Sequence, residues 1–294
     1  MKNVVVVGSA NVDVVLGVRA IPRPGETTLA TSSERHPGGK GANQAVAAAR
    51  DGARTTFVGA LGDDAGAQIV LDAFAGAVDL SVLRRVPGPT GTAYIAVDTA
   101  GENTIIVDPA ANAALRDLTE PELAAVRDAD VVLAQLEIPV ETVVVAFAAA
   151  QDAGGLTVLN AAPARELPDE LWPLVDVLVV NEEEALALAG ADSQDAAVAA
   201  LLRRVPEVIV TLGGKGALLA LRDADPVPVP AHGVQVVDTT GAGDTFCGVF
   251  GAARARGSAA ADAVRRAVAA AAVAVQRPGA VPSIPTAAET EALL

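Results

Sequence analysis

The sequence predicts an α/β fold, a doubly wound and mainly parallel sheet flanked by helices, with a small β-sheet lid. Continuous β-branched runs, such as residues 4–7, are typical of strands buried on both faces of a parallel sheet. These runs alternate with Ala-rich segments of helical periodicity along the 294 residues. Two segments without a helix, 14–36 and 90–108, interrupt the alternation, and we assign them to the lid. Since no linker separates two units, we expect one domain over residues 1–294.

Polar residues follow the first predicted strand. Asn11 and Asp13 are expected in the loop after this strand, and the carboxyl ends of strands face the ligand crevice in a doubly wound sheet. Both residue types also favour turns, so a role in shaping the loop is an equal alternative. Residues 21–36 are polar and rich in turn residues, with short strands at most.

A glycine-rich segment, PGGKGANQ at 37–44, leads into a short Ala-rich helix predicted over 45–50. Glycines before a helix start leave backbone N–H groups accessible to a ligand. Lys40 and Asn43 can therefore line a polar pocket at this point.

Two short β runs at 92–97 and 104–107 follow a β-α unit that we predict as a strand over 55–60 and a helix over 65–75. The turn residues 98–102 join the two runs, which indicates a hairpin. As part of a lid, this hairpin would exclude water from reacting groups. The alternative is an ordinary hairpin at a sheet edge.

The β-α alternation resumes in the middle of the chain. The expected elements are a helix over 118–128, a strand over 131–136, a helix over 139–153 and strands over 156–159 and 176–180. Glu137 follows one of these strands and so occupies another strand end. Asn181 and Glu184 begin a helix that Gly190 ends. Acids in a first turn suit helix capping, and the alternative is indirect Mg²⁺ binding, since Mg²⁺ keeps several waters and needs few carboxylates.

A second glycine-rich segment, Gly213-Gly214-Lys215-Gly216, joins predicted strands at 208–212 and 217–221. Its N–H groups can cradle phosphates. The chain has no G-x-x-x-x-G-K-[ST] motif, and the turn after residues 4–7 lacks the later glycines of a dinucleotide fingerprint. A dehydrogenase is therefore disfavoured. An extended edge segment is marked by Pro226, Pro228 and Pro230.

The segment DTTGAGDTF at 238–246 follows a β-branched run at 234–237, so we predict a strand-to-helix turn. Gly241 and Gly243 allow backbone conformations closed to other residues, and the N–H groups at a helix start bind anions. Asp244 is unexpected at an anion site. It either complements the helix dipole or acts chemically.

The C-terminal part is predicted to be helical. A helix over 246–256 ends at Gly257, and Ser258 caps a helix that extends to about Gln276. Residues 278–283 form a tight loop.

Composition excludes several classes of function. Hydrophobic residues make up 51% and aromatics 2%, so the core must be aliphatic, and the net charge of -15 disfavours nucleic acid and anionic membranes as partners. The single cysteine, Cys247, is expected to be a small buried residue, and His36 and His232 are too isolated for a histidine metal site. The longest late apolar run, 267–275, is too short to span a bilayer. We expect a soluble, cytoplasmic protein.

Seven motifs together resemble one family over nearly the whole chain. They are GSANVD (8–13), PGGKGANQA (37–45), QLEIP (135–139), NAAPARELPDEL (160–171), NEEEA (181–185), TLGGKG (211–216) and DTTGAGDTF (238–246). On these motifs the chain is identified as a member of the ribokinase-like carbohydrate kinases of phosphofructokinase-B type. GGKGANQ, QLE and APARELPDEL resemble the branch that phosphorylates ribose.

The resemblance implies transfer of the γ-phosphoryl group of ATP to the 5-hydroxyl of D-ribose. It implies Asp244 as the base and the amides of Gly241, Ala242 and Gly243 as an anion hole. A sugar carries no charge, so several hydrogen-bonding side chains must fix its hydroxyls. The ribose ligands that the resemblance implies are Asn11, Asp13, Gly39, Lys40, Asn43 and Glu137, beside Asp244.

The resemblance also implies two metal ions and a nucleotide site. Mg²⁺ would lie near Asn181 and Glu184. The ATP loop would comprise Asn181, Thr211, Leu212, Gly213, Gly214, Lys215, Gly216 and Gly243. A K⁺ ion would bind oxygens of Asp238, Thr240, Ala274, Arg277, Gly279 and Ser283, with Arg277 contributing its carbonyl.

Two positions depart from the family pattern: Val268 stands where some members have a histidine near the adenine, and Asn160-Ala161 replaces Asn-Pro. A kinase of the same family that acts on fructose, deoxyribose or a nucleoside is one alternative. A sugar-binding regulator without catalysis is another. An exposed small sheet invites pairing, so we expect a homodimer through the lid.

Overall fold

The structure, a computed structural model, describes residues 2–294, and within them the main sheet has nine strands. Neighbouring strands are parallel except at one edge of the sheet, where the two outermost strands each run antiparallel to the strand beside them. In spatial order they are β15 (Val227–Val229), β14 (Ala217–Leu221), β13 (Glu207–Thr211), β12 (Val177–Asn181), β11 (Leu156–Asn160), β10 (Val131–Ala134), β1 (Asn3–Val7), β4 (Arg54–Val58) and β6 (Val78–Asp79). The first strand, β1, lies inside the sheet, and later strands are added on both sides of it, which confirms the predicted doubly wound sheet.

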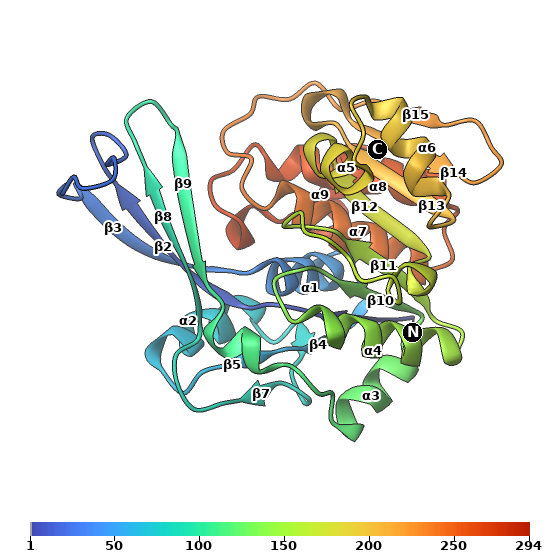
Figure 1. Cartoon of the computed structure of the whole chain (residues 1–294), viewed down its shortest axis with the longest axis horizontal. Helices are drawn as coiled ribbons and strands as arrows, with labels where there is room; N and C mark the ends of the chain where they lie inside the picture. Colours follow the sequence, from blue (N-terminus) through green and yellow to red (C-terminus); the bar gives the residue numbers. More distant parts are fainter. Residues whose placement is uncertain (1) are drawn as a thin grey trace.

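Helices cover both faces of this sheet (Figure 1). Val4 and Val6 of β1 point into one apolar core and Val5 and Val7 into the other, because successive side chains of a strand face opposite sides. The first core includes α1 (Lys40–Arg50), α2 (Ala65–Phe74), α7 (Ala242–Ala255) and α8 (Ala260–Ala274). The second includes α3 (Glu120–Arg127), α4 (Val140–Asp152), α5 (Glu182–Ala189) and α6 (Gln194–Leu202). A short helix, α9 (Ala287–Glu291), packs on α8.

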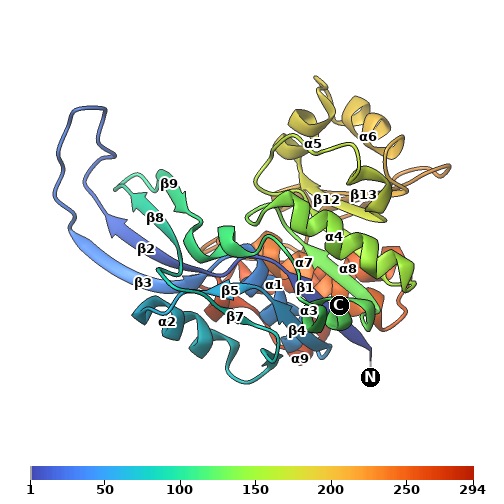
Figure 2. The same cartoon turned by 60° about the horizontal axis from the view of Figure 1, so that its bottom comes forward.

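A second sheet, with four strands in the described part of the chain, projects from the body (Figures 1 and 2). Its order is β3 (Ser32–Gly38), β2 (Asn11–Gly17), β8 (Gly91–Val97) and β9 (Asn103–Asp108), with β2 and β8 parallel. We keep the name lid for this sheet. Two further short strands, β5 (Ala60–Leu61) and β7 (Arg84–Arg85), pair beside the main body.

The lid begins earlier than predicted. Asn11 and Asp13 lie within strand β2 and not in a loop, so they alternate with Val12 and share one face of the lid. Gly38, at the end of β3, is the register partner of Asn11. The expectation of a loop at Asn11 and Asp13 is wrong because pairing with β3 and β8, which no local pattern indicates, makes residues 11–17 a strand.

Other predictions were wrong in detail. Residues 234–237 form no strand, and the turn before α7 starts from an irregular segment. The N-cap residue of α8 is Ala259 and not Ser258. His36 lies in β3 beside Glu34, and α1 begins at Lys40, well before the predicted start. Helices α6 and α9 were not predicted.

A buried ion-pair network fastens the helices of the first core. The Asp51 side chain is 1% exposed and accepts hydrogen bonds from Arg256 at 2.5 Å and Arg266 at 2.9 Å. Arg266 also reaches Glu291 of α9 at 2.7 Å. Thus the C-terminal helix is tied to α1, α7 and α8.

Within residues 2–294, no single helix is both long and apolar enough to cross a bilayer. Only α5 and α6 taken together reach that length and composition, and they are bent by 60° at the break between them.

Candidate active site

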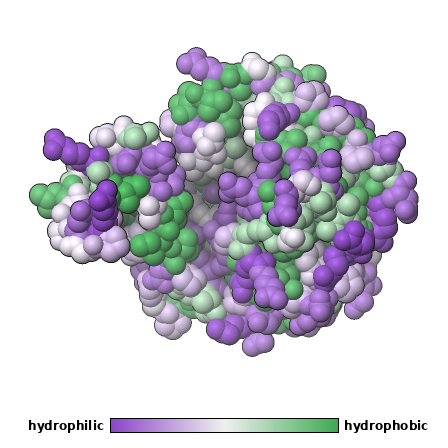
Figure 3. Space-filling view, turned by 45° about the horizontal axis from the view of Figure 1, so that its top comes forward, coloured by the Kyte–Doolittle hydropathy of each residue, from purple (hydrophilic) through white to green (hydrophobic). Residues whose placement is uncertain are grey.

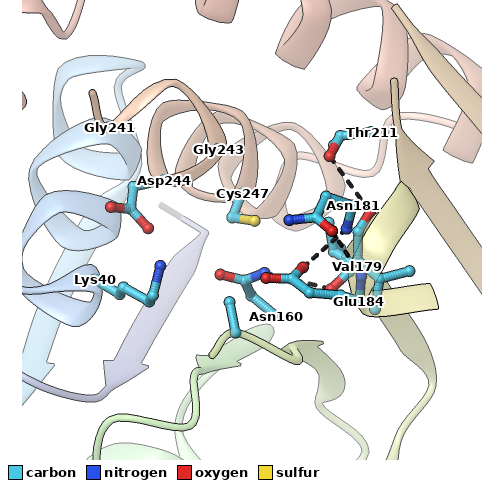
Figure 4. Close-up of a pocket in the computed structure, with 12 residues that line it drawn as sticks. Lys40, Asn160, Val179, Asn181, Glu184, Thr211, Gly241, Gly243, Asp244 and Cys247 are labelled. Carbon is cyan, nitrogen blue, oxygen red and sulfur yellow. Dashed lines mark hydrogen bonds between the residues drawn. The ribbon is translucent and has the colours of Figure 1, made fainter. Parts of the chain in front are cut away.

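A cavity of about 150 Å³ lies where α1, α5 and α7 begin and where β11 to β13 end (Figure 4). Strand ends and helix starts therefore meet at one place, as a doubly wound sheet requires. The cavity is lined by Lys40, Asn160, Ala162, Val179, Val180, Asn181, Glu184, Thr211, Gly241, Gly243, Asp244 and Cys247. Residues predicted from four distant motifs thus come together.

Asp244 lies in the first turn of α7 and is 8% exposed. Two amide groups of α1 hold its carboxylate: Asn43 Nδ2 donates to Oδ2 at 2.9 Å and Gln44 Nε2 donates to Oδ1 at 3.1 Å. Lys40 points toward the same carboxylate from the start of α1 (Figure 4). Sequence reasoning missed Gln44, although it stands beside Asn43 in the GGKGANQ motif.

Asp13 and Glu137 place two more carboxyls near Lys40. Burial is the main cause that raises the pKa of Asp13 to about 7, and the nearby charges of Glu137 and Asp244 contribute to this value against the opposing effect of Lys40. For Lys40, burial lowers the pKa, but the carboxylates of Asp244, Glu137 and Glu184 outweigh burial and raise it above the ordinary value. The site thus concentrates negative charge around one buried cation.

Hydrogen bonds also hold Glu137 and Asn11, two further residues predicted to bind the sugar. Ser9 Oγ donates to Glu137 Oε2 at 2.6 Å, and the backbone N–H of Lys40 donates to the same oxygen at 3.2 Å. Asn112 Nδ2 donates to Asn11 Oδ1 at 2.7 Å. The structure therefore brings the lid strand and the end of β10 to the mouth of the site. Ser9 and Asn112 were not singled out from the sequence.

Two glycines are needed where the chain passes close to itself. Gly39 caps α1 with φ of 89°, and a Cβ there would lie 2.6 Å from the Asn11 nitrogen. Gly241 caps α7 with φ of 72°, and a Cβ there would lie 2.9 Å from the Ala280 side chain. Both positions combine a left-handed backbone with a close contact, so any larger residue would displace the start of its helix.

The start of α7 offers backbone donors to an anion. Ala242 N–H already donates to Thr239 O at 3.2 Å. Within residues 2–294, Gly241 and Gly243 N–H have no hydrogen-bond acceptor. Of the three predicted anion-hole amides, these two are free to bind an incoming oxygen, and the helix dipole favours negative charge there.

Asn181 and Glu184 begin α5 on the opposite wall of the cavity. They form a capping box, and burial raises the pKa of the Glu184 carboxyl. In the described part of the chain, no three His, Cys, Asp or Glu side chains gather to hold a metal ion. The donor set suits Mg²⁺ all the same, because this ion is often bound by one or two carboxylates together with substrate phosphates.

The predicted ATP loop lies at the outer edge of the site. Gly213–Lys215 form a 3-10 turn between β13 and β14, and Gly213, Gly214 and Lys215 are exposed. Lys215 Nζ lies 3.6 Å from Glu182. Thr211 reaches the cavity wall, whereas Leu212 and Gly216 close the turn, since the Leu212 N–H donates to the Gly216 carbonyl at 2.8 Å.

The predicted K⁺ residues also come together. Asp238 accepts hydrogen bonds from Thr240 N at 2.8 Å and from Gly279 N at 2.7 Å, which ties the turn before α7 to the loop after α8. Burial raises the pKa of Asp238, but the hydrogen bond from the Thr240 hydroxyl, together with these two backbone hydrogen bonds, outweighs burial and lowers the pKa below the ordinary value. Ala274, at the end of α8, and Ser283, in the loop that follows, are both buried. Each of the predicted ligands has an oxygen atom to offer, and the Arg277 guanidinium pairs with Glu289, so only the Arg277 carbonyl could serve as one.

The cavity contains residues that sequence reasoning did not assign to it. Cys247 is buried at 1% exposure, as predicted, but it also lines the cavity, and burial raises the pKa of its thiol. Asn160, named in the sequence analysis only within a family motif and its departure from the pattern, contributes to the cavity wall. Val268 is 5% exposed and packs in the first core.

Residues 1–287 match the pfkB family carbohydrate kinase. The chain belongs to this family. The resemblance expected from the seven motifs is thereby confirmed.

Curated relatives cover most of the chain. It is 39% identical to a ribokinase from Haemophilus influenzae over 98% of this chain and 97% of the relative. It is 38% identical to the Bacillus subtilis ribokinase, with both chains fully covered. A bifunctional ribokinase/ribose-5-phosphate isomerase A from Fructilactobacillus sanfranciscensis is 45% identical over 84% of this chain, which spans only 48% of that longer protein.

Solved structures agree with this assignment. The chain is similar to Arabidopsis thaliana ribokinase complexed with ribose and ATP, with a TM-score of 0.94 and 35% identity over 100% of this chain and 99% of the other. It is similar to the Thermotoga maritima ribokinase, with a TM-score of 0.91 and 37% identity over 100% and 99%.

Proposed function

We propose that this chain is an ATP-dependent kinase that phosphorylates D-ribose at the 5-hydroxyl, giving D-ribose 5-phosphate and ADP. The observation that carries the proposal is the buried Asp244 carboxylate, held by two amides beside the free N–H groups of Gly241 and Gly243. The similarity of the whole chain to a ribokinase that binds ribose and ATP supports the choice of substrates.

Asp244 is the general base in this proposal. As the ribose oxygen attacks the γ-phosphorus, the carboxylate takes the hydroxyl proton, the new O–P bond forms, and the bond to the β-phosphate oxygen breaks to release ADP. Little covalent chemistry is asked of the protein, so alignment and neutralisation of charge dominate catalysis. Gly241 and Gly243 N–H bind the phosphoryl oxygens, and each such donor is worth about 2.7–4 kcal/mol in comparable sites.

The sugar is held by neutral and charged side chains from three elements. Asn11 and Asp13 approach from lid strand β2, Lys40 and Asn43 from α1, and Glu137 from the segment that follows β10. Ionised carboxylates accept hydrogen bonds from sugar hydroxyls, whereas Lys40 and the Asn43 amide donate them. This mixture of donors and acceptors suits a polyhydroxylated neutral substrate.

Two metal ions complete the proposed site. Bound near Asn181 and Glu184, Mg²⁺ would neutralise charge on the ATP phosphates, and K⁺ bound in the loop of Asp238 and Gly279 would support the turn that carries the anion hole. The chain's own contribution is to hold Asp238 against the loop at 2.7 Å, so that Gly241 stays packed on Ala280. The oxygen donors at the two places are the observation that supports including these two ions in the proposal.

We further propose a homodimer that forms through the lid, in a cytoplasmic protein. Figure 3 shows the lid as a separate lobe across a hollow from the body, with hydrophobic residues on its surface. Tyr94 is 47% exposed and its register partner Ile106 is 66% exposed, while Ile105 is 53% exposed. A small sheet with exposed apolar side chains and open edges favours pairing with a second copy.

A sugar panel tests the proposed function. Purified protein is assayed for ATP-dependent phosphorylation of ribose, deoxyribose, fructose and a nucleoside, with Mg²⁺ present and with or without K⁺. We expect the highest kcat/KM for ribose and higher activity with K⁺. Preference for another acceptor would assign a different kinase of the family. No turnover of any acceptor would support a sugar-binding regulator.

A further inference from the structure

A chain of buried amides leads from the main sheet to the Asp244 carboxylate. Gln44 and Gln135 are both 0% exposed, so their polar groups can find partners only within the protein, and within residues 2–294 Gln135 Oε1 has none. Gln44 lies on α1, Gln135 follows β10, and Asn160 ends β11. None of the three is among the residues assigned to the sugar, the nucleotide or a metal.

Each amide in the chain orients the next. Asn160 Nδ2 donates to the backbone carbonyl of Val179 at 3.3 Å, which turns Asn160 Oδ1 toward Gln44. Gln44 Nε2 then donates to Asn160 Oδ1 at 3.1 Å. Since a backbone carbonyl only accepts, the direction of the Asn160 amide is determined by the main sheet.

Gln135 acts on the other end of the Gln44 amide. Its Nε2 donates to Gln44 Oε1 at 2.6 Å. With Oε1 engaged there, both protons of Gln44 Nε2 point the other way, one to Asn160 and one to Asp244 Oδ1 at 3.1 Å. A reversed Gln44 amide would set its carbonyl oxygen against the Asp244 carboxylate, which is unfavourable.

We propose that Gln44 is a positioning residue that aims the Asp244 carboxylate, and that Gln135 and Asn160 determine the direction of the Gln44 amide. The inference rests on the proposed function, because it assigns the carboxylate its reacting role. Asn43 holds Oδ2 of Asp244 and Gln44 holds Oδ1, so the two donors together fix the plane of the carboxyl group. Misplacement of a base by about 1 Å can cost on the order of 10²-fold in rate.

Gln44→Leu is the first test. Leucine keeps the buried volume but removes both N–H donors. We expect kcat to fall by about 10- to 100-fold while KM for ATP stays near that of the unaltered protein, because only the orientation of the Asp244 carboxylate is lost. Thermal denaturation measured in parallel separates the change in rate from a change in stability.

Substitutions at Gln135 test the proposal more specifically than Gln44→Leu does, because Gln135 contacts neither Asp244 nor the cavity. Gln135→Leu removes the donor to Gln44 Oε1, so the direction of the Gln44 amide is no longer determined. Gln135→Glu replaces this donor with an acceptor, which attracts Gln44 Nε2 and so reverses the amide. We expect kcat to fall in the order unaltered, Gln135→Leu, Gln135→Glu. In the Gln44→Leu background, neither change should lower kcat further. Equal kcat in all of these variants would overturn the proposal.

Gln68→Glu is the matched control. Gln68 is exposed on α2 and donates to Asp72 at 2.7 Å, so the change also places a carboxyl beside an aspartate, but far from the cavity. We expect its kcat to equal that of the unaltered protein.

A spectroscopic readout separates failure of this inference from failure of the proposed function. The side-chain NH₂ signals of Gln44 are followed by NMR in ¹⁵N-labelled protein. They should move in both Asp244→Asn and Gln135→Leu, whether or not ribose is the acceptor. If they move in neither variant, the amide chain does not orient the carboxylate and the proposal is wrong. Absence of ribose phosphorylation in the sugar panel bears on the proposed function alone.

Discussion

Asn181 and Glu184 hold each other at the start of α5: Glu184 N donates to Asn181 Oδ1 at 2.7 Å, and Asn181 N donates to Glu184 Oε2 at 2.9 Å. The capping interpretation of this pair is therefore correct. It does not compete with the functional one, because both residues also line the cavity. The cap uses one oxygen of the Glu184 carboxylate and leaves the other for a solvated cation.

Glu184→Gln separates the two roles. Glutamine can replace glutamate in a capping box, so the melting temperature should change little. The Mg²⁺ concentration needed for half-maximal activity should rise, since a carboxylate binds this ion better than an amide does. Titration of activity with Mg²⁺ measures the effect. Glu183→Gln, an exposed change in the same turn, is the control and should leave the Mg²⁺ dependence unaltered.

Asp244→Asn removes the proposed base and keeps the shape of the side chain. We expect kcat to fall by about 10² to 10⁴-fold, the range for loss of a general base, while ribose binding is largely retained. Steady-state kinetics and calorimetric titration with ribose measure the two quantities. A kcat near that of the unaltered protein would show that another group takes the proton.

Asp13→Asn should stabilise the protein at alkaline pH. The folded protein keeps the Asp13 proton up to a pKa of about 7, whereas the unfolded chain releases it near the ordinary value of 3.8. Between these values the unfolded chain binds fewer protons, so Asp13 makes stability fall as pH rises. The penalty is fully present above pH 7 and amounts to at most about 4 kcal/mol.

Urea denaturation of the Asp13→Asn variant at pH 5 and pH 8 measures this effect. The gain in the free energy of unfolding should be larger at pH 8. The same variant should raise KM for ribose, because it loses a charged acceptor for the sugar hydroxyls. An equal effect on stability at both pH values would contradict the assigned environment of Asp13.

Asp51→Ala should destabilise the fold without touching the chemistry. It leaves Arg256 and Arg266 without their shared partner in a site where the carboxylate is 1% exposed. Breaking such a pair costs about 3 kcal/mol, measured as a change in the free energy of unfolding. Asp262→Ala removes the exposed pair with Arg265 and should cost less than about 1 kcal/mol.

Ile106→Lys tests the proposed dimer. Ile106 is 66% exposed on the lid, and a lysine there would place two charges in the contact between copies. Light scattering should report a dimer for the unaltered protein and a shift toward monomer for the variant. The corresponding change on the body, Val145→Lys, alters a side chain that is 43% exposed and should leave the mass unchanged. A monomeric unaltered protein would contradict the dimer.

The main sheet could be predicted from the sequence because its strands carry a local signal. Continuous β-branched runs such as residues 4–7 and 208–212 bury both faces, and they became β1 and β13 almost residue for residue. The run at 234–237 has the same composition but finds no partner strand, and Val236 and Val237 are each 59% exposed. Composition alone does not tell a strand from an apolar loop, because pairing decides it.

The site was predicted only where glycines and charged residues gave a pattern along the chain. Asp244, Lys40 and Glu184 stood out in this way, and the structure brings them to one cavity. Gln44 and Gln135 are 91 residues apart and carry no charge, so no local signal joins them. Their contact follows from the packing of α1 on β1 and β4, since β1 lies beside β10 in the sheet. It therefore depends on the packing of the whole sheet.

Cys247 gives the chain a practical advantage for studying the lid in solution. The only thiol of the protein is 1% exposed, and burial raises its pKa, so it should resist alkylating reagents at neutral pH. A cysteine introduced on β9 would then react selectively with a fluorophore or spin label, without removal of the natural one. A label on β9 would thus show whether the lid moves when ribose is added, in protein whose native residues at the site are all retained.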